Sequence, residues 1–486
     1  MKVFRLIVLL SLLICATGVA ATFVYTNNNP AGPNSVSAFA VSSSGVLTAI
    51  AGSPFATGGT GSAEGPYAAT SVRISIVKNI LYVSNNGSHD ISVFSIDPVT
   101  GTLTAVAGSP FATGSTGDAS LAVTPDNQYL YAGSVQTGSI FGFTIAANGA
   151  LAPIAGFPIA APDSLAGMTT TPDGKFLSVA VSGVNEVAMY AIDPTTGKLS
   201  AVSGSPFPAP ALGPAVRVAG LDCNCAANRL FAGMANQTTT DVAVFAIDPT
   251  GALSQIAGSP FSGPGVNSNV PLLSPDDSKL FVSNQSSQSV DVFSVGAGGF
   301  LTLVTGSPFA DAGQPAGMGT DAAGQWLFTA NGISNSIGSF GIGPTGTLTA
   351  APGSPFTAGI PANAALISLA VFPPKNCCPA PVISGASASP DSLWPPNHKF
   401  VEVTIDYSVT NPCPGSCVLT VASNEPSSDG TPEWIVVDAH HVQLQADRLG
   451  NGSGRIYTIT ITCTNTANGQ SSEKQVSVVV PHDQRK

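Results

Sequence analysis

Basic side chains are scarce in this sequence, and two arginines are its strongest candidates for binding chemistry. Lys and Arg together number 16 among 486 residues, against 27 Asp and Glu. Arg73 and Arg217 are expected to occupy the same position in two copies of an internal repeat. Guanidinium groups bind carboxylates, phosphates and polarised carbonyl oxygens. The pair could therefore hold an anionic ligand. The alternative, which we favour, is a salt bridge between repeats, for instance to Asp222 or Glu64.

Candidates for acid–base catalysis are fewer still. His89 is the single histidine of the repeats and lies in a Gly-Ser-His-Asp loop, where we expect it to be solvated. Many carboxylates of the repeats stand in Asp-Pro or Pro-Asp pairs, where an aspartate caps a turn by accepting backbone hydrogen bonds. We expect this capping role of Asp97, Asp126, Asp173, Asp193, Asp248, Asp276 and Asp277. The sequence therefore predicts no catalytic residue.

The cysteines favour disulfides over metal binding. Cys223-Asn-Cys225 could form a local disulfide, half of a metal site, or pairs with other cysteines, and disulfide chemistry is favoured because no nearby pair supplies further zinc ligands. His440 and His441 would point to opposite faces of a strand, and no calcium-loop pattern occurs. We expect no metal and no cofactor, and a disulfide of Cys463 with Cys413 or Cys417. The disulfide candidates are Cys223, Cys225, Cys377, Cys378, Cys413, Cys417 and Cys463.

A repeat of about 50 residues must position these groups. Gly-Ser-Pro-Phe or a near copy occurs seven times, with successive spacings of 56, 48, 48, 54, 48 and 47 residues. A fixed period of this length indicates a solenoid, a propeller or an array of small domains. The copies begin at Gly52, Gly108, Gly156, Gly204, Gly258, Gly306 and Gly353.

Each repeat predicts four short antiparallel strands and no helix. In residues 81–111, three runs alternate apolar and polar residues and are separated by turn residues such as Asp97-Pro-Val-Thr-Gly101. Four strands in about 50 residues describe a propeller blade. Residues 23–27 match a second strand, and the missing first strand appears last, at residues 367–372. We therefore expect seven blades, the first completed by both ends of the region.

The strand motifs are similar to those of a known family. Leu81-Tyr-Val-Ser-Asn85 and Phe23-Val-Tyr-Thr-Asn27 resemble the Tyr-Val-Thr-Asn repeats of bacterial surface propellers. The frame of Ile-Asp-Pro-Thr-Gly and of Pro172-Asp-Gly-Lys-Phe-Leu177 resembles the seven-bladed 6-phosphogluconolactonase-like group. The resemblance covers residues 23–374 and implies the fold. It also implies a lactone-opening hydrolase as one possible activity.

The last hundred residues predict a second domain. After a connector rich in proline and cysteine, short alternating strands fit an immunoglobulin-like β-sandwich. Trp394-Pro-Pro-Asn-His-Lys399, Ser423-Asn-Glu-Pro426, Gly454-Arg-Ile-Tyr457 and Val480-Pro-His-Asp-Gln484 resemble a bacterial Ig-like module of secreted proteins, which implies adhesion or spacing. The predicted fold is all-β, with a propeller at 22–374 and the sandwich at 375–486.

The first 21 residues predict a signal peptide. Lys2 and Arg5 precede an apolar stretch and a small-residue cleavage site. We therefore expect secretion to the periplasm, the cell surface or the medium, without membrane insertion after cleavage. The net charge of −11 and the lack of a basic stripe argue against nucleic acid as a partner.

Two functions remain open from the sequence. Scarce His, Arg and Lys favour an exported, non-catalytic scaffold or adhesion protein that binds a glycan, a small anion or another protein. The alternative is a lactonase-type hydrolase that opens a small sugar lactone, which would need a base and an electrophile for the carbonyl oxygen.

Overall fold

The computed structural model is an all-β protein, and its described residues include one short 3₁₀ helix, η2 (Ala297–Gly299). It describes residues 21–63, 74–115, 119–134, 136–210, 213, 216–235, 238–357, 359–366, 368–375, 377, 381–410, 415–427, 432–450, 453–465 and 471–483. The predicted signal peptide lies almost entirely outside these ranges. Within them, no helix has the length and apolar character to cross a membrane.

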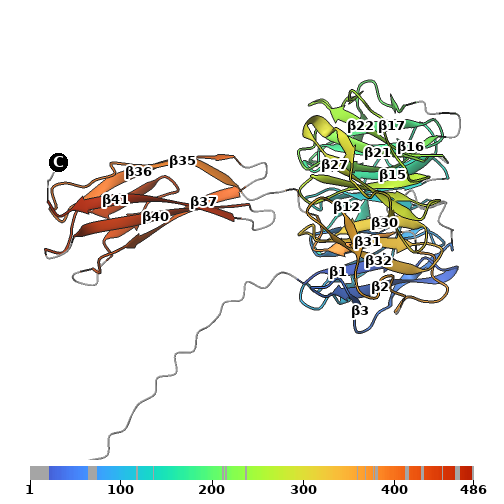
Figure 1. Ribbon diagram of the computed structural model, residues 1–486, viewed down its shortest axis with the longest axis horizontal. Coiled ribbons are helices and arrows are strands. Elements are labelled where there is room, and N and C mark those ends of the chain that lie inside the picture. The colour runs from blue at the N-terminus through green and yellow to red at the C-terminus, as the bar shows by residue number, and fades with distance from the viewer. Residues whose placement is uncertain are drawn as a thin grey trace, which may run out of the picture. The chain divides into compact units, whose positions relative to one another are not determined.

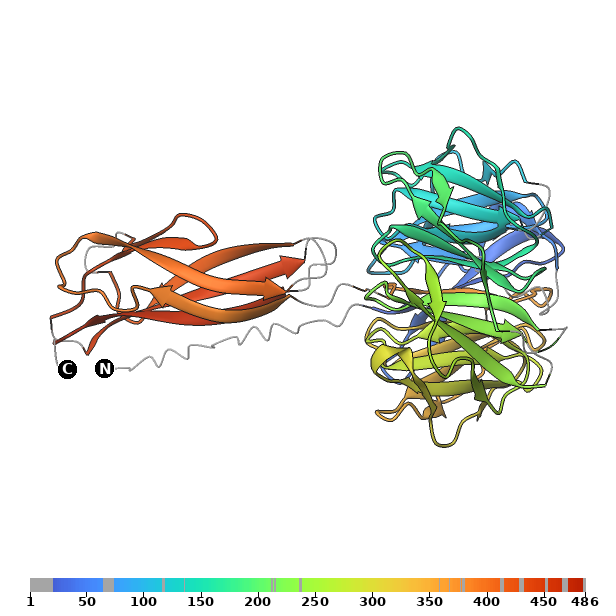
Figure 2. The same cartoon turned by 90° about the horizontal axis from the view of Figure 1, so that it is seen from above.

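The chain separates into two compact units. The first consists of residues 1–223 and 230–374, and the second of residues 224–229 and 375–486. Figures 1 and 2 show both units as all-β structures, the first coloured blue to orange and the second orange to red.

The first unit contains seven antiparallel sheets, and each is one blade. The strands follow sequence order in six blades, and in the first blade the last strand of the unit joins its first three strands. The first strands are β34 (Leu369–Phe372), β5 (Ile74–Val77), β10 (Ala119–Val123), β15 (Leu165–Thr170), β20 (Arg217–Cys223), β25 (Ser268–Leu273) and β30 (Pro315–Thr320). The second strands are β1 (Phe23–Asn27), β6 (Ile80–Asn85), β11 (Tyr129–Ser134), β16 (Phe176–Val181), β21 (Arg229–Ala235), β26 (Lys279–Asn284) and β31 (Trp326–Asn331).

The outer half of each blade follows the same plan. The third strands are β2 (Gly32–Val41), β7 (Asp90–Ile96), β12 (Ser139–Ile145), β17 (Glu186–Ile192), β22 (Thr240–Ile247), β27 (Ser289–Val295) and β32 (Ser336–Ile342). The fourth strands are β3 (Leu47–Ala49), β8 (Leu103–Ala105), β13 (Leu151–Pro153), β18 (Leu199–Ala201), β23 (Leu253–Gln255), β28 (Leu301–Leu303) and β33 (Leu348–Ala350).

The seven first strands form a closed ring. Each one contacts the first strand of the next blade, and β34 contacts both β30 and β5. β34 pairs with β1 from Phe23↔Phe372 to Thr26↔Leu369, so the two ends of the region share one blade. Both views place the blue first blade beside the orange last blade (Figures 1 and 2). The predicted seven-bladed propeller and its mode of closure are confirmed.

Gly-Ser-Pro-Phe interrupts the outer strand of each blade. After the break the chain pairs again with the third strand, in β4 (Phe55–Gly61), β9 (Phe111–Ala112), β14 (Ile159–Ala160), β19 (Phe207–Pro208), β24 (Phe261–Gly263) and β29 (Phe309–Ala310). At the break, the serine hydroxyl accepts a third-strand N–H, as in Val244 N to Ser259 Oγ at 2.9 Å. The outer strand is therefore two short pieces rather than the single one predicted. The same bond is made by Ser53, Ser109, Ser205, Ser307 and Ser354.

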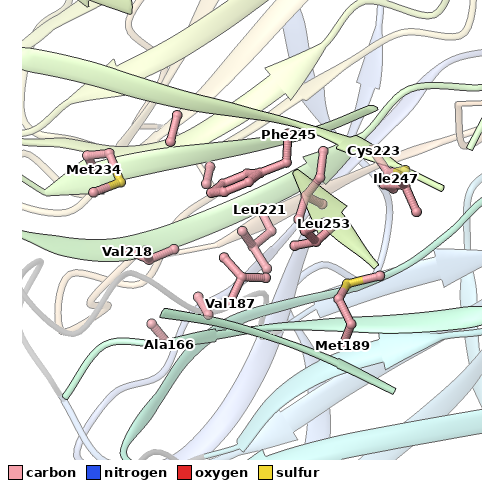
Figure 3. Close-up of a cluster of buried hydrophobic side chains, with 14 of the residues drawn as sticks. Ala166, Val187, Met189, Val218, Leu221, Cys223, Met234, Phe245, Ile247 and Leu253 are labelled. Carbon is pink, nitrogen blue, oxygen red and sulfur yellow. The ribbon is translucent and has the colours of Figure 1, made fainter. Parts of the chain in front are cut away.

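Neighbouring blades are joined by apolar packing and by the motif tyrosines. Figure 3 shows Val187 and Met189 of the fourth blade packed against Val218, Leu221 and Phe245 of the fifth. Tyr25 donates a hydrogen bond to the carbonyl of Gly101 at 2.7 Å, and Tyr131 does the same to Gly197 at 2.8 Å. Each bond crosses from one blade to the next, which explains a buried tyrosine at this point of the repeat.

The second unit is a two-sheet sandwich. One sheet has the order β35 (Val382–Ser389), β36 (Phe400–Thr410), β39 (His441–Gln445) and β38 (Trp434–Val436). The other has the order β37 (Gly415–Ser423), β40 (Gly454–Asn465) and β41 (Ser471–Pro481). Their facing side chains form one core that includes Val442, Leu444, Ile459 and Ile461. The β-sandwich expected from the strand pattern is therefore present.

The motif segments of this unit meet around a buried arginine. The side chain of Arg455 is fully buried and forms ion pairs with Glu425 and Glu433. Glu425 also accepts the backbone N–H of Leu449 at 2.8 Å. A buried charge is tolerated only when paired and hydrogen-bonded, so these contacts account for Arg and Glu in the motifs.

Candidate functional site

The strand directions give the propeller two distinct faces. First strands begin beside the ends of second strands, as the pair Arg217↔Ala235 shows, and they end beside the starts of second strands, as in Cys223↔Leu230. We call the face at the starts of the first strands the loop face. It also carries the hairpins between second and third strands and the connections between blades. The opposite face, with the tight turns, is the turn face.

Arg217 lies at the loop face. It is the first residue of β20 and its side chain is exposed. Among the described residues no carboxylate forms an ion pair with it. Asp222 lies near the other end of β20, where its carboxylate accepts the N–H of Leu273 in the neighbouring first strand at 2.7 Å. Arg217 therefore does not form the predicted salt bridge with Asp222, and Arg73 and Glu64 lie outside the described residues.

The register also shows that Arg217 does not share the strand position of Ala122 and Thr169, to which the repeat had aligned it. Ala122 and Thr169 pair with the third residue of their second strands, Tyr131 and Ser178. In the fifth blade that partner is Phe231, and it pairs with Asp222 rather than with Arg217. Counting from the repeat misplaced Arg217 because β20 is longer than other first strands and contains a bulge between Val218 and Leu221.

Asn269 is a second polar group on this part of the loop face, and the sequence analysis missed it. It lies in β25, next to β20, inside a register shift between Ser268 and Pro271. The side chain is 3% exposed, and its Nδ2 has no hydrogen-bond partner among the described residues. The backbone carbonyl of Asn269 packs against Gly220 and Gly233. A Cβ added at these glycines would lie 2.6 and 2.7 Å from the carbonyl oxygen. The sequence feature that could have indicated this position is an asparagine in a first strand beside small residues of the neighbouring blade.

The loop face carries several carboxylates, of which Asp311 is the most perturbed. Burial raises the pKa of Asp311, against the lowering effect of hydrogen bonds from Thr329, Asn331 and Ala312. Its Oδ1 accepts Asn331 Nδ2 at 2.9 Å and the N–H of Ala312 at 2.7 Å. Its Oδ2 has no hydrogen-bond partner among the residues described. An added Cβ at Gly338 would lie 3.0 Å from Asp311 Oδ1, so glycine leaves room for this carboxylate. A carboxyl with a raised pKa and a free oxygen lone pair has the properties of a general base.

His89 also lies on the loop face, in the hairpin between β6 and β7. Its backbone carbonyl accepts the hydroxyl of Thr113 at 2.7 Å, and its φ is 56°. The ring is half-buried and Nδ1 is enclosed, without a partner in the described part of the chain. The expectation of a solvated histidine is therefore wrong, and the residue holds a turn and a neighbouring loop together.

The repeated turn aspartates lie on the turn face and cap turns as predicted. Asp97 accepts the N–H groups of Val99 at 2.8 Å and Thr100 at 3.0 Å, and these bonds hold its pKa below the usual value. Asp277 differs, because it occupies a turn position with φ 57°. The capping bonds of the others involve Asp126, Asp173, Asp193, Asp248 and Asp276.

The cysteines form disulfides rather than a metal site. Cys417 pairs with Cys463, which is one of the two pairings expected for Cys463. Cys225 pairs with Cys377, 152 residues away, so the local Cys223–Cys225 bond is not formed. Cys223 is buried in β20, and Cys378 and Cys413 lie outside the described residues. Within those residues, no group of His, Cys, Asp and Glu has the geometry to hold a metal ion.

The histidines of the second unit do not converge. His440 Nδ1 contacts the carbonyl of Ile405 at 3.0 Å, whereas His441 Nδ1 lies 2.9 Å from the Asp438 carboxylate. That carboxylate raises the pKa of His441 through a hydrogen bond. His398 pairs with Asp447 at 3.1 Å. These contacts explain the polar motif residues of the sandwich without a ligand.

The loop face carries side chains of the two kinds that carbonyl chemistry uses. It presents an exposed guanidinium at Arg217 and an unsatisfied amide donor at Asn269 on the neighbouring strand. Asp311 adds a carboxyl able to accept a proton. Carbonyl addition needs these two kinds of group, an electrophile for the oxygen and a base for water.

Comparison with known proteins identifies the propeller. Residues 106–215 and 231–361 match the family model described as "Lactonase, 7-bladed beta-propeller". A comparison with curated protein sequences found no match.

Solved structures show the same fold. The periplasmic gluconolactonase PpgL of Pseudomonas aeruginosa is 18% identical with a TM-score of 0.58, and the alignment covers 72% of this chain and 98% of that one. A Bacteroides uniformis protein, provisionally assigned as a 6-phosphogluconolactonase, is 18% identical with a TM-score of 0.58 and coverages of 72% and 99%. A protein from Lactobacillus plantarum is 19% identical with a TM-score of 0.56 and coverages of 73% and 100%. Through its propeller, this chain belongs to the lactonase family of seven-bladed β-propellers.

Proposed function

We propose that the protein is an exported lactonase-type hydrolase that opens a sugar lactone at the loop face of its propeller. The observation that carries this proposal is the family match across most of the propeller. The groups required for carbonyl chemistry on one face support it. The scaffold function favoured by the scarcity of basic residues is therefore replaced by the alternative that the sequence analysis kept open.

The reaction assigns a role to each group. Asp311 accepts a proton from water, the oxygen of that water adds to the lactone carbonyl carbon, and negative charge develops on the carbonyl oxygen. Arg217, with Asn269 as a neutral donor, stabilises that oxygen. Collapse of the tetrahedral intermediate breaks the ring C–O bond, and the proton passes to the leaving hydroxyl. The product is an open hydroxy acid, which ionises and releases one proton.

Proton release on glucono-δ-lactone tests the proposal. The uncatalysed opening of the lactone is subtracted from each trace. We expect Arg217→Ala to lower kcat/KM by about 100-fold, the effect of removing one preorganised donor, and Arg217→Lys to keep part of the rate through its point charge. Lys175→Ala removes an exposed cation from the turn face and serves as the matched control. A wild-type rate equal to the uncatalysed rate would contradict the proposal.

Asp311→Asn tests the role of the general base independently of the role of the electrophile. It removes the proton acceptor with almost no change of shape, so we expect kcat to fall while KM stays near the wild-type value. In the wild type, kcat should rise with pH through the raised pKa of Asp311, because only the ionised carboxylate accepts a proton. A wild-type profile without this rise would assign the base to another group.

Non-catalytic binding remains the second candidate function. The observation that favours it is that His89 is the only histidine between residues 22 and 374. Calorimetric binding of gluconolactone or gluconate without any turnover would support it. Export rests on the apolar leader and on the two disulfides, which form in oxidising compartments.

A further inference from the structure

The two faces of the propeller differ in the number of basic residues that they carry. Of its basic residues, five lie on the turn face, and Arg217 is the one basic residue of the loop face that the structure describes. The five are Lys78, Lys175, Lys198, Arg229 and Lys279. The carboxylates of the described loop face are Asp90, Asp163, Glu186, Asp241, Asp291 and Asp311.

Two of these carboxylates are fully enclosed and held by neutral donors. Asp291 is 0% exposed and accepts the N–H of Gly265 at 3.0 Å and the hydroxyl of Ser307 at 3.1 Å. Asp241 is 3% exposed and accepts the hydroxyls of Thr239 at 2.6 Å and Ser262 at 2.5 Å. The two donors to Asp291 carry no positive charge to offset its carboxylate.

Two further carboxylates reach the surface of the same face. Asp163 is exposed in the connection that leads into the first strand β15, and Glu186 is half-buried at the start of β17. Three further charged residues of the propeller lie outside the described ranges. They are Glu64, Arg73 and Asp118, which together add one more negative charge.

We infer that the loop face selects an uncharged lactone and rejects one that carries a phosphate group. This inference rests on the proposed function and specifies its substrate class. A phosphate monoester bears close to two negative charges at neutral pH. Arg217 offsets one charge, whereas the six described carboxylates of the same face repel the ligand. Salt screens this repulsion, with a Debye length of about 8 Å at physiological ionic strength. A neutral sugar lactone meets no such penalty.

The competing outcome is a phosphate subsite built from both arginines. If Arg73 and Arg217 converge on one anion, the phosphorylated lactone would be the better substrate. The charge inventory of the face opposes this, because the two arginines are outnumbered by the carboxylates even when every loop residue in the sequence is included.

The test compares two substrates with the same ring. We would measure kcat/KM for glucono-δ-lactone and for its 6-phosphate at low salt and at high salt. At about 0.5 M salt the Debye length is only a few ångströms, so most of the repulsion is screened. We expect the neutral lactone to be favoured by at least about 10-fold at low salt, the lower end of electrostatic effects on encounter. Salt should raise kcat/KM for the phosphate and leave the neutral substrate unchanged.

A charge variant with a matched control completes the design. Asp163→Asn with Glu186→Gln removes two surface charges from the loop face, and we expect it to raise kcat/KM for the phosphate several-fold without changing that for the neutral lactone. Asp173→Asn makes the same chemical change on the turn face and should alter neither.

The outcomes separate the two proposals. Turnover of both lactones with the phosphate equal or preferred would overturn the charge selection and leave the lactonase function standing. Turnover of neither would contradict the lactonase function, and the charge selection with it. Preference for the neutral lactone that persists unchanged in high salt and in the charge variant would also overturn the inference, because its cause would then be steric.

Discussion

Asp311 shows how one residue of the loop face couples charge to folding. Its carboxyl has a raised pKa in the folded protein because it is largely buried. The folded state therefore holds a proton at pH values where the unfolded chain, with an ordinary carboxyl, has lost it. The contribution of this group to the free energy of unfolding therefore falls as pH rises from the ordinary carboxyl pKa through the raised one.

Replacing Asp311 by Asn should remove that pH dependence. We compare the free energy of unfolding of the wild type with that of the variant at each pH. The difference, wild type minus variant, should decline as pH rises through the raised pKa and then stay level. Urea unfolding at a series of pH values measures it. Asp193→Asn is the control of opposite sign: backbone hydrogen bonds lower the pKa of Asp193, so its contribution is lost as pH falls. A difference for Asp311 that did not change with pH would show that burial leaves its titration untouched.

Residue positions at the loop face were the hardest to predict from the sequence. The repeat predicts that first strands begin at equivalent places, but β15, β20, β25 and β30 each contain a register shift near the loop face. A bulge adds one residue without any change in composition, so alignment by motif misplaced Arg217. The position of Asn269 at the loop face could not be predicted for the same reason. The capping aspartates were predictable because turn chemistry is local.

At the scale of the element, the serine hydroxyl of Gly-Ser-Pro-Phe takes the place of a backbone carbonyl as a hydrogen-bond acceptor. The outer strand breaks at this point, and the serine hydroxyl accepts the third-strand N–H that the strand would otherwise have satisfied. Ser259→Ala leaves the N–H of buried Val244 without that bond, at a cost of about 1–3 kcal/mol in the free energy of unfolding. Chemical denaturation measures this loss. Ser254→Ala, at an exposed position of β23, should be nearly neutral, and equal losses in the two variants would contradict the role assigned to Ser259.

The phenylalanine of the same motif packs against the blade. Phe261 is partly buried against the core of Val242, Leu280 and Phe293, and its ring meets Phe300 edge-to-face with centroids 6.2 Å apart. We expect Phe261→Ala to destabilise the protein by about 2–4 kcal/mol, near the lower range for buried aromatic residues.

Phe300→Ala provides the comparison for Phe261→Ala. Its side chain is 49% exposed, so its loss should be smaller. The double variant should show a coupling of about 0.5–1.5 kcal/mol for the ring pair. A melting temperature unchanged by Phe261→Ala would exclude the packing role.

At the scale of the whole molecule, the sequence predicted the architecture closely and the chemistry poorly. Seven motif copies and a displaced first strand were enough to predict ring closure, because a ring removes the open sheet edges that a linear stack would leave. Chemistry depends instead on which loops converge on one face, and nothing in the repeat period encodes that. The scarcity of His and Lys argued for a scaffold, although a carboxylate and an arginine together can serve a lactonase.

The central claim is that the loop face opens a lactone, and one comparison tests it most directly. Purified wild-type protein and Arg217→Ala would be assayed side by side for proton release from glucono-δ-lactone, with the uncatalysed opening subtracted. The account predicts a clear catalytic rate for the wild type and a loss of about 100-fold in kcat/KM for the variant. A wild-type rate no greater than the uncatalysed rate, or a variant as active as the wild type, would contradict it.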